Sequence, residues 1–173
     1  IIDFPPGTGD EPLTVSQSLP GIDGVVIVTT PQEVALLDSR KSINFAKTIS
    51  VPVLGVVENM SGYTIRGKSE PNSKISIMGP GGVPIDCQSD NDGRWEVTLD
   101  VFKSGGGEES SRELEVPFLG SLPFDPGIVR GGDDGVHRII AEPEGETAKA
   151  FKSIVEGIVE QLEKDSQRSL RII

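Results

Sequence analysis

The sequence feature that most constrains the fold is a strand–helix–strand succession between Gly24 and Asn59. Residues 24–30 read GVVIVTT and residues 51–59 read VPVLGVVEN, two continuous apolar runs rich in β-branched residues. Such runs are typical of strands that are covered on both faces, as in a parallel sheet. Between them, QEVALLDSRKSINFAKTI carries apolar residues near helical spacing. The pattern predicts a right-handed βαβ unit and an α/β fold.

The last part of the chain predicts further elements of the same kind. A short strand is expected around Pro117–Gly120, and a helix over Glu146–Lys164. In that helix one face is apolar and is expected to pack on the sheet; it consists of Ala148, Phe151, Ile154, Val155, Ile158, Val159 and Leu162. The acidic stretch Gly131–Gly135 predicts a flexible loop, with His137 in the loop that follows.

The middle of the chain changes character. Within residues 67–99, KISIM and RWEVTL alternate in polarity, and GPGG and NDG are turn signals. This pattern favours β-hairpins, so we expect a small β-hairpin-rich insert there. It divides the chain into an α/β portion at 1–66, the insert at 67–99, and the rest of the α/β portion at 100–173.

Composition excludes several classes of protein. The chain of 173 residues has 27 acidic residues against 16 lysines and arginines, a formal net charge of −11. Such a balance argues against binding nucleic acid or an anionic membrane, because both require clustered cations. No apolar run approaches the roughly 20 residues of a membrane span, and nothing resembles a secretory leader. A single cysteine, Cys87, excludes an internal disulfide framework. We therefore expect a cytoplasmic protein.

Candidate ligand-binding turns follow the predicted strands. In an open parallel sheet, ligands bind beyond the carboxyl ends of the strands. Three turns lie at such ends, at residues 3–10, 29–32 and 58–62. Asp3 ends a β-type segment, and Gly7 and Gly9 allow backbone N–H groups to approach an anion. An acid there could hold Mg²⁺ through water while the loop senses a phosphate. The alternative is a Pro-Gly turn with a capping Asp.

Several segments, in order, make the sequence recognisable. IIDFPPGTGDEPLTVSQ, GVVIVTTPQEVALLDSRKSINFAK, VPVLGVVENMSGY and DVFKSGGGEESSRELEVPFLGSLPFDPGIVRGGDDG resemble the Mrp-type (ApbC-like) iron–sulfur carrier ATPases. These proteins belong to the MinD/ParA group of P-loop NTPases. The resemblance covers residues 1–66 and resumes near residue 100. It implies a partial doubly wound parallel sheet of a P-loop NTPase, interrupted by the insert.

The resemblance implies roles for the first turn. Asp3 resembles the acid that ends the Walker-B-like strand and holds the magnesium-bound water. Gly7 corresponds to the residue whose backbone N–H senses the γ-phosphate, so Asp3 and Gly7 are the implied catalytic positions. Thr8, Gly9 and Asp10 complete this loop and are implied contacts to the nucleotide.

It also implies a site for the nucleotide base. Asn59 resembles the residue that recognises the adenine edge, and Pro123, Phe124 and Asp125 resemble the segment that flanks the base. Residues 105–107 match the glycine-rich start of the next helix, where N-terminal amides are free to bind an anion. The alternative at 105–107 is an ordinary helix entry after a loop.

Two departures from the family pattern limit what the resemblance implies. The family's glycine-rich P-loop with two lysines has no counterpart here, and GKSE at Gly67 lacks the preceding strand and the glycine spacing. We therefore expect the chain to be the C-terminal part of such an ATPase. By itself it should neither bind ATP tightly nor hydrolyse it. In addition, TIRGKSEPN stands where the family carries a C-x-x-C pair. Since two copies normally share four thiolates around one cluster, binding of an iron–sulfur cluster is in doubt.

The insert has a weaker resemblance of its own. Residues 67–99 resemble part of a bacterial Ig-like repeat, in which Trp95 is a core aromatic and Asn91–Gly93 a turn. SDNDG at 89–93 suggests a calcium loop but lacks the glutamate of an EF-hand, which favours a solvated turn. Cys87 is interpreted as a small buried residue, with a ligand role as the alternative.

Three functional hypotheses follow. The first is the C-terminal part of an ATP-binding iron–sulfur cluster carrier that acts as a homodimer on client apoproteins, without nucleic acid or membrane. The second is a MinD/ParA-like positioning ATPase without a cluster. The third is a non-catalytic interaction domain in which the insert is the working surface.

Overall fold

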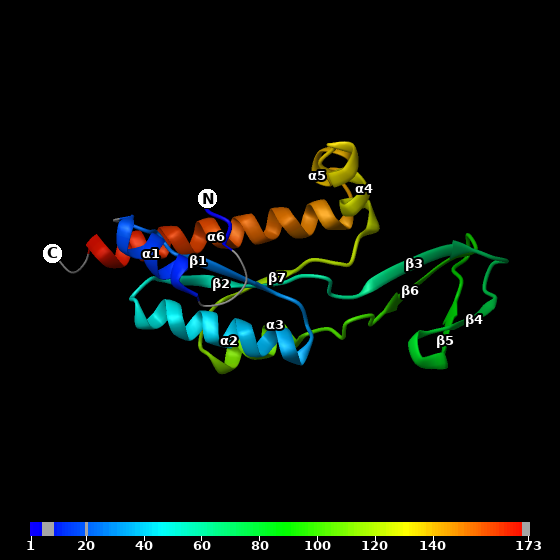
Figure 1. Ribbon diagram of the computed structural model, residues 1–173. Coiled ribbons are helices and arrows are strands. Elements are labelled where there is room, and N and C mark those ends of the chain that lie inside the picture. Colours follow the sequence, from blue (N-terminus) through cyan, green and yellow to red (C-terminus); the bar gives the residue numbers. More distant parts are fainter. Residues whose placement is uncertain (5–8, 20, 171–173) are drawn as a thin grey trace.

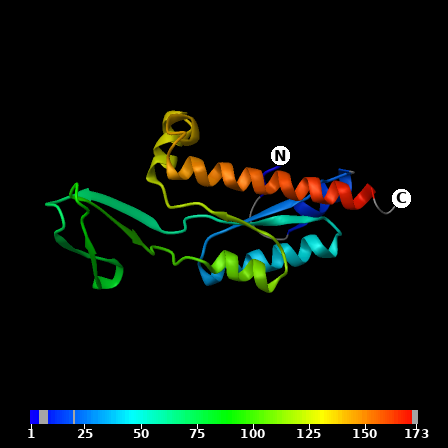
Figure 2. The same ribbon diagram turned by 180° about the vertical axis from the view of Figure 1, so that it is seen from behind.

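The computed structural model describes all residues except 5–8, 20 and 171–173. It consists of an α/β body and an elongated arm, residues 63–99, that projects from one end of the body (Figures 1 and 2). Both strands of the arm that join the body do so at the end where the body's parallel strands terminate (Figure 1). The arm therefore lies at the edge of the sheet where ligands bind in open α/β folds.

The body contains the predicted parallel sheet. Its strands are β1 (Val25–Thr29), β2 (Val53–Glu58) and β7 (Phe118–Ser121), in the order β1-β2-β7, and both pairings are parallel. The central strand β2 is buried over most of its length, as its uninterrupted apolar sequence predicts. The α/β fold and its parallel sheet are confirmed.

Helices cover both faces of this sheet. On one face lie α2 (Glu33–Thr48) and α3 (Gly106–Glu113), and on the other lies the long α6 (Glu146–Leu170), as Figure 1 shows. The α2 face buries apolar side chains that include Leu36, Ile43 and Ala46. On the α6 side, a core cluster contains Val57, Leu119, Leu122 and Ile154. Of the apolar face predicted for α6, Ala148 and Ile154 are buried and Phe151 and Ile158 pack against this cluster, but Val155 and Val159 are exposed.

Three short helices were not predicted. Asp10–Ser18 forms α1, Pro126–Asp134 forms α4 and Arg138–Ala141 forms α5. The expectation of a flexible acidic loop at residues 131–135 was wrong, because most of that stretch is the last part of α4. Capping residues at its two ends explain why α4 forms. Asp125 caps its start, Pro126 occupies its first turn, and Gly135 ends it in the left-handed conformation with φ 69°.

The arm consists of two antiparallel pairs. β3 (Tyr63–Lys68) pairs with β6 (Arg94–Leu99), and β4 (Lys74–Met78) pairs with β5 (Pro84–Gln88). A single 3-10 turn, Pro80–Gly82, joins β4 to β5. The expected hairpins are present. Strand pairing begins at Tyr63, opposite Leu99, four residues before the start expected for the insert.

Two features of the arm bear on the sequence expectations. Trp95 is half-buried against Gly67, where a Cβ would lie 2.2 Å from the indole ring, so only glycine fits opposite it. The turn at 91–93 forms as expected, and the Asp90 carboxylate accepts the backbone N–H groups of Asp92 (2.9 Å) and Arg94 (2.8 Å). The Asp90 side chain therefore stabilises the turn itself.

The N-terminal segment differs from expectation. Ile1–Phe4 form no strand, because no neighbouring strand in the described part of the chain pairs with them. Figure 1 shows the N terminus over the body near α6, whereas β1 and β2 end toward the arm. Among the described residues, no helix is long and apolar enough to cross a membrane.

Candidate functional site

The carboxyl ends of the three parallel strands meet at one edge, which we call the ligand edge (residues 29–32, 58–62 and 121–125). Backbone pairing continues past the strands. Asn59 N–H donates to the Thr29 carbonyl at 2.7 Å, and Leu122 N–H donates to the Glu58 carbonyl at 2.7 Å. The turns that follow β1, β2 and β7 are therefore held in register with one another.

Beyond the strands, the second and third turns run side by side. Ser61 N–H donates to the Leu122 carbonyl at 2.9 Å, and Phe124 N–H donates to the Gly62 carbonyl at 2.8 Å. These bonds bring Asn59 and the 123–125 segment, which are more than sixty residues apart in sequence, to the same edge. The two segments therefore lie side by side, while their contacts to a base stay a prediction.

The Asn59 side chain has a hydrogen-bond donor that is available to a ligand. Its side chain is half-buried, and its Oδ1 accepts the backbone N–H of Met60 at 2.9 Å. Within the part of the chain that the structure describes, no partner is recorded for the Nδ2 donor. A carboxamide with a free donor and an acceptor lone pair can pair with the N6–H₂ and N7 groups of adenine.

Asp125 is committed to holding neighbouring helices in place. Its Oδ1 accepts the Gly127 N–H at 2.7 Å, and its Oδ2 accepts from Thr147 Oγ1 at 2.6 Å and Arg138 Nε at 2.9 Å. Burial acts to raise the pKa of Asp125, but these hydrogen bonds and the Arg138 charge outweigh it, so the pKa lies below its ordinary value. Asp125 therefore orients the segment after β7, and both of its carboxylate oxygens accept hydrogen bonds.

Glu58, at the end of the central strand, begins the candidate turn at residues 58–62, but the sequence assigned it no role of its own. Its side chain is fully buried, with a relative exposure of 0%. Oε1 accepts from Ser61 Oγ at 2.6 Å and from Gly105 N–H at 3.0 Å, and Oε2 accepts from Gly107 N–H at 2.7 Å. The expectation that the amides at 105–107 are free was wrong for Gly105 and Gly107, because Glu58 occupies them. The available signal was an acid ending an apolar strand run.

Aromatic side chains gather where the arm joins the body. The rings of Tyr63 and Phe124 meet edge to face with centroids 5.6 Å apart, and Phe102 lies 6.1 Å from Phe124. Tyr63 begins β3 and Phe102 follows β6, so both connections of the arm contact the segment after β7. Contacts of this geometry contribute energy beyond simple burial.

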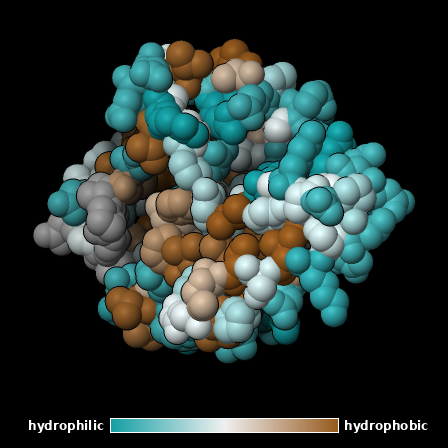
Figure 3. Space-filling model, turned by 90° about the vertical axis from the view of Figure 1, so that its right-hand side faces the viewer, coloured by the Kyte–Doolittle hydropathy of each residue, from teal (hydrophilic) through white to brown (hydrophobic). Residues whose placement is uncertain are grey.

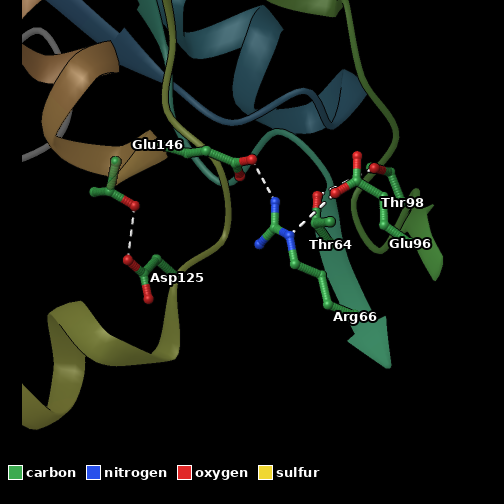
Figure 4. A network of polar contacts seen from close by, with 7 residues as sticks. Thr64, Arg66, Glu96, Thr98, Asp125 and Glu146 are labelled. Atoms are coloured by element: carbon green, nitrogen blue, oxygen red, sulfur yellow. Dashed lines mark hydrogen bonds and ion pairs between the residues drawn. The ribbon is translucent and has the colours of Figure 1, made fainter. Parts of the chain in front are cut away.

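A cavity of about 370 Å³ separates the root of the arm from α4, α5 and α6. One wall includes Phe124 and Asp125, and the opposite wall includes Thr64 and Arg66 of β3. Figure 4 shows Arg66 reaching from the arm to Glu96 on β6 (Nε–Oε2 3.0 Å) and to Glu146 at the start of α6. The hydrogen bond that Arg66 donates to the Glu146 carboxylate is the main influence that raises the pKa of Arg66 above its ordinary value. Arg66 thus joins the arm to the body across the cavity.

The arm also exposes apolar side chains. Figure 3 views the molecule from the arm end and shows apolar surface near the middle of that face, bordered by polar side chains. Beside the turn that joins β4 to β5, Met78 and Val83 are 72% and 62% exposed. Single exposed apolar side chains of this kind are common on protein surfaces.

The remaining predicted site residues lie apart from the ligand edge or outside the described part. Gly7 and Thr8 lie outside the described residues. Gly9 is the N-cap position of α1 and Asp10 its first residue. Asp3 is exposed and belongs to the unpaired N-terminal segment. Its assignment to a magnesium-bound water therefore stays a prediction.

The described residues do not fit a four-thiolate cluster. Cys87 is the single cysteine, half-buried in β5, and two copies would supply two thiolates where such a cluster takes four. No group of three or more His, Cys, Asp or Glu side chains suited to a metal ion occurs in the part of the chain that the structure describes.

The fold is an α/β fold whose parallel sheet resembles that of MinD-type P-loop NTPases. A solved structure of the cell division ATPase MinD from Pyrococcus furiosus matches with a TM-score of 0.50 and 25% identity, covering 80% of this chain and 43% of that one. The family profile described as "ParA: NUBPL iron-transfer P-loop NTPase" matches residues 1–92 and 85–159. The chain belongs to this family.

Curated relatives agree with this assignment. An iron–sulfur cluster carrier protein of Methanocaldococcus jannaschii is 39% identical over 94% of this chain and 46% of its own length. Another, from Synechocystis, is 41% identical over 91% of this chain and 37% of its own length. A cytosolic Fe-S cluster assembly factor NUBP2 homologue of Trichoplax adhaerens is 38% identical over 92% of this chain. The chain spans about half, or less, of the length of these relatives.

Proposed function

We propose that this chain supplies the base-binding side of the nucleotide site in an ATP-dependent iron–sulfur cluster carrier. The observation that carries the proposal is the ligand edge, where Asn59 and the segment 123–125 are hydrogen-bonded into adjacent turns at the carboxyl ends of parallel strands. Membership in the iron-transfer NTPase family and the names of the relatives support the same function.

In this proposal, each residue of the edge has a distinct role. Asn59 recognises the adenine edge through its free carboxamide donor, while Pro123 and Phe124 form the apolar wall beside the base. Asp125 holds that wall through its bonds to α4 and α6. A bound Mg-ATP would supply the phosphoanhydride that hydrolysis breaks.

The loop at residues 3–10 would supply the phosphate side of the nucleotide site. Asp3 would contact a magnesium-bound water and Gly7 the γ-phosphate, with Thr8, Gly9 and Asp10 lining the same loop. Motif order and family membership support these roles. The phosphates would need further donors of the P-loop type, so the affinity of this chain for Mg-ATP is expected to be weak.

The cluster in this scheme is cargo, and the clients are iron–sulfur apoproteins in the cytoplasm. A homodimer is part of the proposal because it is the state in which two chains can hold one cluster between them. Cys87 cannot complete a four-thiolate site by itself. The single cysteine favours a second candidate, a MinD/ParA-like ATPase that carries no cluster. Anaerobic iron and sulfide analysis separates the two, since only a carrier retains both elements.

Nucleotide titration of the ¹⁵N-labelled chain tests the base site. Mg-ATP is expected to shift the amide signals of Asn59 and Phe124 with affinity weaker than micromolar, and Mg-GTP to shift them less because its base presents a carbonyl where adenine presents N6. Asn59→Ala should remove this preference. Equal responses to ATP and GTP, or no response at either amide, would overturn the proposal. Micromolar affinity by calorimetry would overturn the expectation of weak binding.

A further inference from the structure

Glu58 is an acidic residue that is buried among hydrogen-bond donors. It ends β2, the central strand, and its carboxylate is removed from water. Burying an ionised carboxylate is unfavourable unless hydrogen bonds or charges compensate it. Here two backbone N–H groups and one hydroxyl converge on its two oxygens. Both N–H groups belong to the start of α3, where the helix dipole favours negative charge.

The three donors come from the two connections between body and arm. Ser61 lies on the outgoing connection, between β2 and β3, and its hydroxyl donates to Oε1. Gly105 and Gly107 lie on the returning connection, after β6, and their N–H groups donate to Oε1 and Oε2. The Glu58 carboxylate therefore links the two connections between the body and the arm.

The same connection carries Asn59. Asn59 stands between Glu58 and Ser61, so a bond from Ser61 to Glu58 spans it and restricts the turn in which it lies. Close packing between Glu58 and the start of α3 restricts the position of the carboxylate. A Cβ at Gly107 would lie 3.0 Å from the Glu58 Cβ. The glycine thus allows the helix to start directly against the carboxylate.

We propose that Glu58 is the positioning residue of the ligand edge. Its carboxylate links Ser61 to the start of α3, and this link, which we call the clasp, holds Asn59 in the conformation that receives the base. The ligand in this inference rests on the proposed function, whereas the clasp rests on the geometry alone. A residue needed only for packing would be replaceable by an apolar side chain of similar volume, often without loss of stability.

The test compares the ¹⁵N-labelled full chain with Glu58→Ala, Glu58→Gln and a control, Ser39→Ala. Ser39 is also buried and donates to the Ala35 carbonyl at 2.9 Å, but it has no bond to the ligand edge. The measurements are the amide signals of Asn59, Gly105 and Gly107 and the response to Mg-ATP. Both Glu58 variants should broaden or split the Asn59 signal and weaken Mg-ATP binding about tenfold, whereas the control should do neither.

Added formate distinguishes positioning by a carboxylate from simple packing. In Glu58→Ala, sodium formate can place a carboxylate against the freed N–H groups of Gly105 and Gly107, whereas sodium chloride at equal ionic strength cannot. We expect formate to restore the Asn59 signal and most of the Mg-ATP affinity. Unchanged signals in both Glu58 variants, or equal effects of formate and chloride, would overturn the proposal.

Two further comparisons keep the test decisive. If Glu58→Ala fails to fold, Ser61→Ala removes one donor and retains the carboxylate; it should disturb Asn59 and leave Gly107 unchanged. A wild-type Asn59 signal in Ser61→Ala would then overturn the proposal. If the unmodified chain shows no response to Mg-ATP, the proposed function fails, while the amide signals still decide whether Glu58 positions Asn59.

Discussion

The body and the arm obtain their stability in different ways. The body buries a parallel sheet between helices on both faces, and Leu54, Val56 and Val57 of its central strand are almost inaccessible. In the arm, which the structure describes throughout, Val97 is the one apolar side chain that is fully buried. Isolated two-stranded hairpins are only marginally stable in water. The arm therefore depends on its root, where Glu58 and the Tyr63–Phe124 contact join it to the body.

Charge separates the two regions as well. The arm carries four cationic and five acidic side chains, a net charge of −1, so almost all of the chain's −11 belongs to the body. Electrostatic repulsion disfavours contact between this acidic body and other acidic surfaces. The nearly neutral arm exposes Met78 and Val83, whereas most of the exposed large apolar side chains, such as Val34 and Ile140, lie on the body.

A matched pair of isoleucine truncations should give the largest contrast. Ile43 of α2 is fully buried, whereas Ile77 of β4 is half-buried. Ile43→Ala should lower the free energy of unfolding by about 3 kcal/mol, and Ile77→Ala by about 1 kcal/mol or less, because less cavity forms at an open site. Urea denaturation measures both values. Equal losses would show that the arm and the body share one core.

Asp125→Ala should have an intermediate effect within the body. Loss of the helix cap on α4 is expected to cost about 1 to 2 kcal/mol, and Asp125→Asn should cost less because asparagine also caps helices. The same urea measurement checks this order. If both variants lose equal stability, the ion pair with Arg138 matters more than the cap.

The effect of Asp125 should depend on pH in a definite direction. Its pKa is lower in the folded protein than the ordinary value of about 3.9, so its contribution is fully present above the unfolded pKa and is lost as the pH falls through the folded pKa. The stability difference between the wild type and Asp125→Ala should therefore be constant near neutrality and shrink below about pH 4. A difference that grows on acidification would contradict this assignment.

The smallest effect is expected at the exposed bridge between arm and body. Arg66 is about half exposed, and its pairs with Glu96 and Glu146 face solvent. Arg66→Ala should change the free energy of unfolding by only about 0.5 kcal/mol, since exposed pairs contribute little. Amide signals of Thr64 and Thr147 should nevertheless shift, and added salt should reduce the difference from the wild type. No shift at either amide would show that the arm is held without Arg66.

The elements with a strong local period were predictable from the sequence. The strands β1 and β2, helix α2 and the hairpin segments follow from apolar spacing and turn residues within short windows. Helix α4 was missed because its cap, Asp125, and its terminator, Gly135, outweigh an acidic, glycine-rich composition that favours a loop. The short N-terminal strand was predicted from residue type alone, and it requires a neighbouring strand that the described sheet does not supply.

The sequence by itself determined the α/β class, the β-hairpins in the middle of the chain, and the likeness that points to Asn59 and the 123–125 segment. Only the tertiary structure decided which groups meet at the ligand edge. Glu58 binds amides that are 47 and 49 residues further along the chain. Such a contact depends on how the arm leaves the body and returns to it, because hydrogen bonds between distant segments are set by topology and carry no periodic signal in the sequence.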